Sequence, residues 1–263
     1  MNDALLDKNP VITICAPRNS GKSFLIKQIL TTFMTHWDNI VIFCPTLKFN
    51  NDYEELGERG KNVQIYRISD FGPEEVNGIF AQHEETMARC VERERELKRA
   101  KKKKTTIRTV DAHGAEVVEE KVLEELECPR TLVVFDDCID SGVLHFHGVV
   151  DKYAERGRHI NISCIISSQR ISAVSRSIRI NSDLFLTFSP YSIKEFEQFA
   201  DQFVPKRMKR AFLQNSDRLF DEPYHFVFLD NHERQHKRKL KHSRADRFVR
   251  DQYQLVFDVL QEK

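Results

Sequence analysis

One short stretch near the start of the sequence constrains the fold more than any other feature. An apolar run at residues 11–15 (VITIC) leads into eight residues that match G-x-x-x-x-G-K-[ST], with alanine in the first position, and an amphipathic stretch follows. This order predicts a strand, a phosphate-binding loop and a helix. The eight loop residues are Ala16, Pro17, Arg18, Asn19, Ser20, Gly21, Lys22 and Ser23.

Such a loop binds nucleotide phosphates through backbone N–H groups that end on the positive N-terminus of a helix. Gly21 is expected to let the backbone approach the phosphates, Lys22 to bridge the β- and γ-phosphates, and the Ser23 hydroxyl to bind Mg²⁺. The alternative is a merely structural turn, which the strand–loop–helix context disfavours. The sequence therefore predicts a site for ATP and Mg²⁺.

Short β-branched runs alternate with longer amphipathic stretches along the chain, as in βαβ units with a parallel sheet. Strands are predicted near residues 11–15, 39–44, 63–68, 131–136, 160–167, 183–188 and 224–229. Helices are predicted near residues 22–35, 73–100, 144–156, 192–202, 206–214 and 246–260. We therefore expect an α/β fold with a mainly parallel sheet.

Two segments depart from this alternation. Residues 84–128 are highly charged and contain a possible hairpin, so they are predicted to be an insertion on an ATPase domain that spans residues 1–230. Residues 231–263 are predicted to form a basic linker and a C-terminal helix.

A second chemical signal follows the apolar run TLVVF at residues 131–135. Asp136 can hold Mg²⁺ through water at the end of a buried strand, and Asp137 can orient and deprotonate the attacking water. Asp137 occupies the position where many additional-strand ATPases carry glutamate, so this base is one methylene shorter. The alternative is a strand that ends in two ordinary loop acids, but the phosphate loop upstream favours the functional interpretation.

The strand INISCIISS ends at Gln169, and a polar side chain there can reach the γ-phosphate and sense its presence. The alternative is an ordinary solvated strand end.

Charge and composition limit the classes of partner. The 41 basic and 40 acidic residues leave a net charge of +1, so any nucleic-acid surface must be a local patch. The candidates are residues 98–104 and 234–244, which lack aromatic side chains and would suit sequence-independent contact with duplex phosphates. Alternatively, Glu94 and Lys98 at i,i+4 indicate a solvated helix.

The six cysteines include no C-x-x-C pair, and no signal pattern or apolar run of membrane-span length is present. We expect a soluble protein with reduced cysteines that is not secreted.

Residues 157–188 (GRHINISCIISSQRISAVSRSIRINSDLFLTF) resemble the packaging ATPases of poxviruses and other large double-stranded DNA viruses, members of the FtsK/HerA superfamily. Residues 39–53 (NIVIFCPTLKFNNDY) and the sequence around Asp136 and Asp137 look similar too, so the resemblance covers roughly residues 10–190. It implies a RecA-like αβα core, ATP hydrolysis, ring assembly and movement of double-stranded DNA into capsids.

The expected partners are double-stranded DNA, further copies of the chain in a ring of five or six, and a capsid or portal-vertex protein. No small-molecule substrate beyond ATP is expected. The expected location is the host cytoplasm at virus assembly sites, or the virion.

Three other functions compete with this one. Arg18 in the phosphate loop resembles the loop of tailed-phage large terminases, but the roughly 75 residues after Phe188 are too few for an ordinary nuclease domain. A nucleotide-dependent capsid-assembly factor that does not move DNA is the second, and a small-molecule kinase, which Gln169 disfavours, is the third.

In a ring, an arginine from one subunit can act on the ATP of the next. We expect Arg158, just before the Gln169 strand, to have this role. Arg156, Arg170 and Arg176 are alternative candidates for this role. The remaining alternative is that Arg158 is an ordinary surface arginine.

Overall fold

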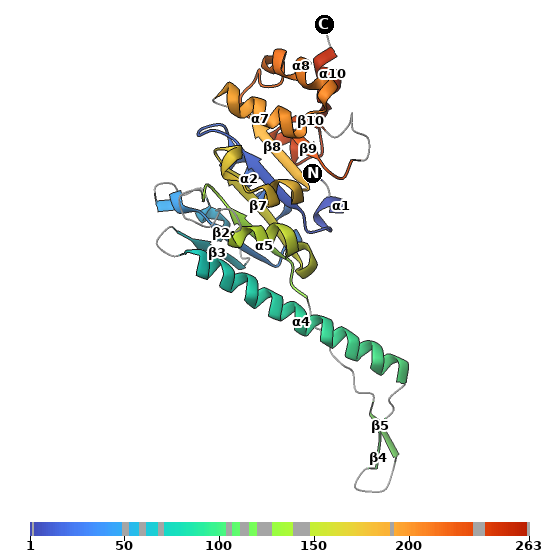
Figure 1. Ribbon diagram of the computed structural model, residues 1–263. Coiled ribbons are helices and arrows are strands. Elements are labelled where there is room, and N and C mark those ends of the chain that lie inside the picture. The colour runs from blue at the N-terminus through green and yellow to red at the C-terminus, as the bar shows by residue number, and fades with distance from the viewer. Residues whose placement is uncertain are drawn as a thin grey trace.

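The computed structural model describes residues 1, 3–48, 53–57, 62–67, 71–103, 107–110, 116–119, 128–138, 148–189, 192–233 and 240–261, and within them nine strands form one central sheet (Figure 1). The strand order is β11-β10-β9-β8-β1-β7-β6-β2-β3. The six strands from β8 to β3 run parallel, whereas β9, β10 and β11 are each antiparallel to their neighbours. The strands are β1 (Val11–Cys15), β2 (Asn39–Phe43), β3 (Asn62–Tyr66), β6 (Thr131–Phe135), β7 (Ile162–Ser168), β8 (Leu184–Phe188), β9 (His225–Asp230), β10 (Leu240–Arg244) and β11 (Gln254–Leu255).

Both faces of the sheet are buried. In β1, Val11 and Cys15 belong to one hydrophobic core, and Ile12 and Ile14 belong to the other, because successive side chains of a strand point to opposite faces. Helices α4 (Pro73–Lys103), α5 (Val149–Arg156), α6 (Arg176–Asn181), α7 (Ile193–Phe203), α8 (Lys206–Gln214) and α10 (Val256–Gln261) supply the first core. Helices α1 (Asp3–Leu6), α2 (Lys22–Phe33), α3 (Glu54–Gly57) and α9 (Ala245–Phe248) supply the second. These three layers confirm the predicted αβα fold with a mainly parallel sheet.

The predicted charged insertion begins inside a core helix. Val76 and Phe80 of α4 pack on the sheet, and the later turns project away from it toward a hairpin of β4 (Ile107–Val110) and β5 (Glu116–Glu119) (Figure 1). Lys98 Nζ lies 2.5 Å from Glu94 Oε1, the expected i,i+4 pair. Residues 104–106, 111–115 and 120–127 of the insertion lie outside the described residues. No described helix, α4 included, is both long and apolar enough to cross a membrane.

The prediction of one helix over residues 246–260 is wrong. The chain forms α9, reverses direction at Asp251, whose φ is 57°, and then adds β11 before α10. The Ser243 hydroxyl donates to the Gln252 carbonyl (2.7 Å) and holds the reversal in place. Part of the predicted basic linker is also a strand, since β10 pairs with β9 over five residues, from Leu240 opposite Leu229 to Arg244 opposite His225.

Lys241 belongs to the basic run at residues 234–244 that is a candidate for DNA contact, and the structure contradicts this role for it. Its side chain is buried, its Nζ donates to Asp230 Oδ2 (2.6 Å), and it lies 4.3 Å from the centre of the Tyr253 ring. The positive charge of Lys241 is therefore neutralised inside the fold and does not face DNA. Residues 234–239 of the same run lie outside the described residues.

Candidate functional site

The phosphate loop connects β1 to α2. Gly21 adopts the left-handed conformation (φ 102°, ψ 14°), which explains why the motif requires glycine there. Ala16 is buried, its N–H donates to the Ser168 carbonyl (2.9 Å), and its φ is not positive, so alanine is tolerated in the first position. Gly21 gives α2 no side-chain cap, so the free N–H groups of the first turn are available to an anion.

Lys22 is buried and lies across the inside of the loop. Its ammonium group donates to the carbonyl oxygens of Ala16 and Pro17, both at 2.9 Å. Burial lowers the pKa of Lys22, while the charges of Asp137 and Asp136 oppose that shift. The Ser20 hydroxyl also donates to the Pro17 carbonyl (2.8 Å), which fixes the shape of the loop.

Asp136 is buried at the end of β6 and accepts three hydrogen bonds from hydroxyl groups. Ser167 donates to Oδ1 (2.5 Å), whereas Tyr53 (2.7 Å) and Ser23 (3.3 Å) donate to Oδ2. Burial raises the pKa of Asp136, and the hydrogen bonds from Ser167 and Tyr53 and the charge of Lys22 act in the opposite direction.

The predicted metal ligands, Ser23 and Asp136, thus lie side by side although they are 113 positions apart in the chain. Hydroxyl and carboxylate oxygens are the donors that Mg²⁺ prefers. A carboxylate whose charge is disfavoured by burial would gain a stabilising positive charge when the metal binds. The residues present fit Mg²⁺.

Asp137 and Gln169, which the sequence suggested separately, are brought into contact. The Gln169 side-chain amide donates to Asp137 Oδ2 (2.7 Å), because β6 and β7 are neighbours and their carboxyl ends meet. The Asp137 N–H donates to the Ser167 hydroxyl (3.1 Å). The backbone of Asp137 is left-handed (φ 55°), a conformation that is uncommon outside glycine and is enriched at functional sites.

The second carboxylate oxygen of Asp137 remains available. Among the described residues, Oδ1 is buried and has no hydrogen-bond partner. A buried acceptor without a partner is costly, so such groups call for a functional explanation. One oxygen of Asp137 is thus fixed by Gln169, and the other has no partner in the part of the chain that the structure describes.

Arg158 does not lie with these residues. It is exposed on a short 3-10 helix (Gly157–Ile160) at the amino end of β7, whereas Gln169 follows the carboxyl end of that strand. Its rival Arg156 is ion-paired with Glu84 and lies 5.7 Å from the centre of the Phe80 ring.

Sequence reasoning missed Tyr53 and Ser167, two of the three residues whose hydroxyl groups donate to Asp136. Ser167 carried a faint signal, because a pair of serines ends an otherwise apolar strand. Tyr53 ends the stretch at residues 39–53 that carries the resemblance, but nothing there linked it to Asp136, which is 83 positions away along the chain.

Comparisons with known proteins concern the fold. No protein-family model matches the sequence, and a comparison with curated proteins finds no relative. B204, the DNA-packaging ATPase from Sulfolobus turreted icosahedral virus, matches with a TM-score of 0.54 at 16% identity, over 90% of this chain and 97% of B204. The genome packaging NTPase B204 from Sulfolobus turreted icosahedral virus 2, in complex with ATP-gammaS, gives 0.54 at 15% identity, over 93% and 98% of the two chains. EssC (ATPases 2 and 3) from Geobacillus thermodenitrificans gives 0.57 at 16% identity, over 86% of this chain and 38% of that one. The chain therefore shares the fold of these ATPases.

Proposed function

We propose that the protein is a Mg²⁺-dependent ATPase of the FtsK/HerA type that moves double-stranded DNA into a viral capsid. One observation carries the ATPase part of this proposal. Asp136, Asp137 and Gln169 follow the carboxyl ends of the adjacent parallel strands β6 and β7, and Asp136 contacts Ser23 of the phosphate loop. Ligand sites of open α/β sheets lie at this edge.

Hydrolysis at this site follows from the roles of the side chains. When ATP binds, the Lys22 ammonium group leaves the carbonyl oxygens of Ala16 and Pro17 and donates to oxygens of the β- and γ-phosphates instead. Ser23 and Asp136 would hold Mg²⁺, which when bound would neutralise negative charge on the phosphates. Asp137 orients a water molecule and accepts its proton on Oδ1, while Gln169 fixes Oδ2. Because Gln169 holds the base, a γ-phosphate that competes for its amide would change the position of Asp137.

Asp137→Asn is expected to lower kcat by roughly 10²-fold or more, the usual scale for loss of a general base. The Kd for ATP should not change, because an amide keeps the shape of the carboxylate and its contact with Gln169. Single-turnover hydrolysis and equilibrium binding measure the two quantities. Asp201→Asn, an exposed carboxylate on α7, is the matched control. Turnover close to that of the wild type would make Asp137 an ordinary loop residue.

The DNA part of the proposal is supported by the fold shared with B204, which is described as a DNA-packaging ATPase. We infer a closed ring of five or six copies around the duplex, together with a capsid or portal-vertex partner at virus assembly sites in the host cytoplasm. A nucleotide-dependent capsid-assembly factor is the alternative. ATP turnover with and without duplex DNA separates the two, and the mass under ATP tests the ring. Unstimulated turnover would favour the assembly factor.

DNA binding should depend steeply on salt and little on base sequence, since binding to phosphates releases counterions. Replacing Lys237, Arg238 and Lys239 with glutamine should flatten the plot of log K against log salt by about 0.9 for each phosphate that the variant no longer neutralises. The same change at Lys101, Lys102 and Lys103 is the comparison. If the slope is unchanged in the variant at residues 237–239 and flattened in the variant at residues 101–103, the DNA contacts α4 and not the C-terminal run.

A further inference from the structure

A hollow of about 390 Å³ lies beside the phosphate loop, on the flank away from Asp136. Residues 17–20 of the loop form one wall, and Phe188, at the end of β8, together with residues 220–225, forms the other. Its volume falls in the range of about 300–1,000 Å³ that is usual for small-molecule sites. The roles proposed above for the phosphate loop and for Asp136 and Asp137 do not involve this hollow.

Two aromatic side chains stand together next to this hollow. Tyr224 and Phe24 are 48% and 43% exposed, and their ring centres are 5.3 Å apart. The Tyr224 ring lies directly against the phosphate loop, because a Cβ added at Gly21 would come 2.4 Å from Tyr224 Cδ1. Tyr224 also has a positive φ of 67°, which is rare for a bulky residue and is found at ligand-binding positions. Exposed rings beside a phosphate loop suit stacking on a nucleobase.

The direction of a bound nucleotide follows from the charges. Two carboxylates, those of Asp221 and Glu222, line the hollow together with one guanidinium, that of Arg18, and carboxylates repel phosphate groups. Lys22 and the metal ligand Asp136 lie toward β7 and β6, on the other flank of β1. The triphosphate must therefore point toward β6, and only the uncharged end of the nucleotide suits the hollow. About 14 Å, three strand spacings, separate β6 from β8, and an extended nucleoside triphosphate bridges that span.

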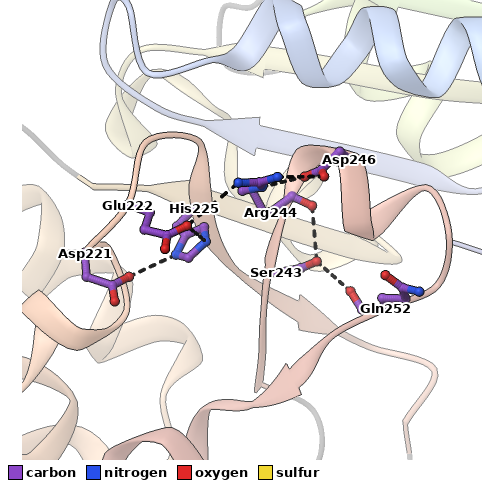
Figure 2. A network of polar contacts seen from close by, with 7 residues as sticks. All are labelled: Asp221, Glu222, His225, Ser243, Arg244, Asp246 and Gln252. Carbon is purple, nitrogen blue, oxygen red and sulfur yellow. Dashed lines mark hydrogen bonds and ion pairs between the residues drawn. The ribbon is translucent and has the colours of Figure 1, made fainter.

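Figure 2 shows how the C-terminal segment braces this loop. His225 Nδ1 lies 3.0 Å from Asp221 Oδ1, and its Nε2 lies 3.4 Å from Glu222 Oε2. Arg244 stands opposite His225 in the β9–β10 pair and approaches Glu222 (3.8 Å). Asp246 holds the Arg244 guanidinium through two hydrogen bonds of 2.6 and 2.8 Å. Residues from β10 and α9 thus fix the position of the loop that carries Tyr224.

We propose that the hollow is the nucleobase and ribose subsite of the ATP site, with Tyr224 as the stacking ring and Arg244 as a positioning residue. The inference rests on the proposed ATPase function. It gives the segment after residue 230 a role in nucleotide binding, where the sequence suggested a basic linker with a possible DNA contact and a C-terminal helix. Asp221 and Glu222 would accept hydrogen bonds from ribose hydroxyls or from the exocyclic amino group of the base.

The test compares Mg-ATP with Mg-tripolyphosphate, which lacks base and ribose, by calorimetric titration of the full chain. Tyr224→Leu should weaken ATP binding by roughly 5- to 150-fold, the range for losing one base–aromatic stack, and leave tripolyphosphate binding unchanged. Tyr224→Phe should bind ATP like the wild type. Tyr253→Leu, which removes a tyrosine of similar exposure (45%) elsewhere, is the matched control.

Equal weakening for both ligands would overturn the subsite, because Tyr224 would then merely support the phosphate loop. Unchanged ATP binding in Tyr224→Leu would overturn it as well. Failure of the proposed function has a different signature: the wild type would bind neither ligand, or Lys22→Ala would bind both as well as the wild type does.

Arg244 has its own test. Arg244→Gln should raise the KM for ATP by roughly two- to fivefold, the scale of an exposed ion pair, and leave kcat unchanged. Arg244→Lys should restore part of the affinity, since it keeps the charge without the two-pronged contact with Asp246. Arg247→Gln, an exposed arginine on the adjoining helix α9, is the control. An unchanged KM, or a fall in kcat alone, would overturn the positioning role.

Discussion

Lys22→Ala is expected to reduce Mg-ATP turnover to the background level, a loss of at least roughly 10²–10³-fold. Lys22 is the buried cation at the phosphate loop, and its present contacts are the Ala16 and Pro17 carbonyls. Charge that develops on the γ-phosphate oxygens during hydrolysis would lose its nearest protein donor. Steady-state phosphate release at saturating ATP measures the effect.

Because Lys22 also holds two loop carbonyls, its removal could loosen the loop. Asp136→Asn is expected to have the same effect through loss of a metal ligand. Asparagine keeps the size of the side chain and one of the two acceptor oxygens to which Ser167 and Tyr53 donate. Lys27→Ala, a half-exposed lysine on the same helix, should stay active. Circular dichroism and thermal unfolding confirm that each variant is folded. An active Lys22→Ala protein would contradict the proposal that ATP is hydrolysed at this phosphate loop.

The phosphate loop could be predicted because its chemistry is local. Gly21, Lys22 and Ser23 are consecutive, and the conformation of Gly21 depends on its own missing side chain. Asp136 and Gln169 could be predicted because each ends an apolar strand, and neighbouring parallel strands bring such ends together. Their hydrogen-bonded contacts could not be predicted, since these depend on the exact positions of the side chains in the folded protein.

The C-terminal segment was misjudged because its strand is not apolar. Lys241, His242 and Ser243 are all buried in β10, so no alternation of polar and apolar residues marks it. Lys241 is tolerated there because Asp230, a residue of the neighbouring strand, neutralises its charge and the Tyr253 ring lies beside it. The structure of this segment therefore depends on the pairing of β10 with β9, which the charge pattern of the sequence does not indicate.

Arg158→Ala is expected to lower turnover by about 10³–10⁵-fold, the contribution of an arginine that stabilises charge on a transferred phosphoryl group. The strand β7 has seven residues between Arg158 and Gln169, so roughly 23 Å separates them at 3.3 Å per residue. The side chain is exposed and too far away to reach the ATP of its own subunit. If Arg158 contributes to hydrolysis, it must do so in a neighbouring subunit, as head-to-tail contacts in a closed ring allow.

Subunit mixing tests this directly. Arg158→Ala and Lys22→Ala proteins should each be inactive alone, yet a mixture should regain part of the activity. In mixed rings, an intact Arg158 from one variant faces an intact phosphate loop of the other. Arg158→Lys should stay nearly inactive, since lysine lacks the planar guanidinium that matches phosphate oxygens. Arg250→Ala, another exposed arginine, is the matched control. If mass measurements show mixed rings and no activity returns, Arg158 does not act between subunits, and Arg170 and Arg176 become the next candidates.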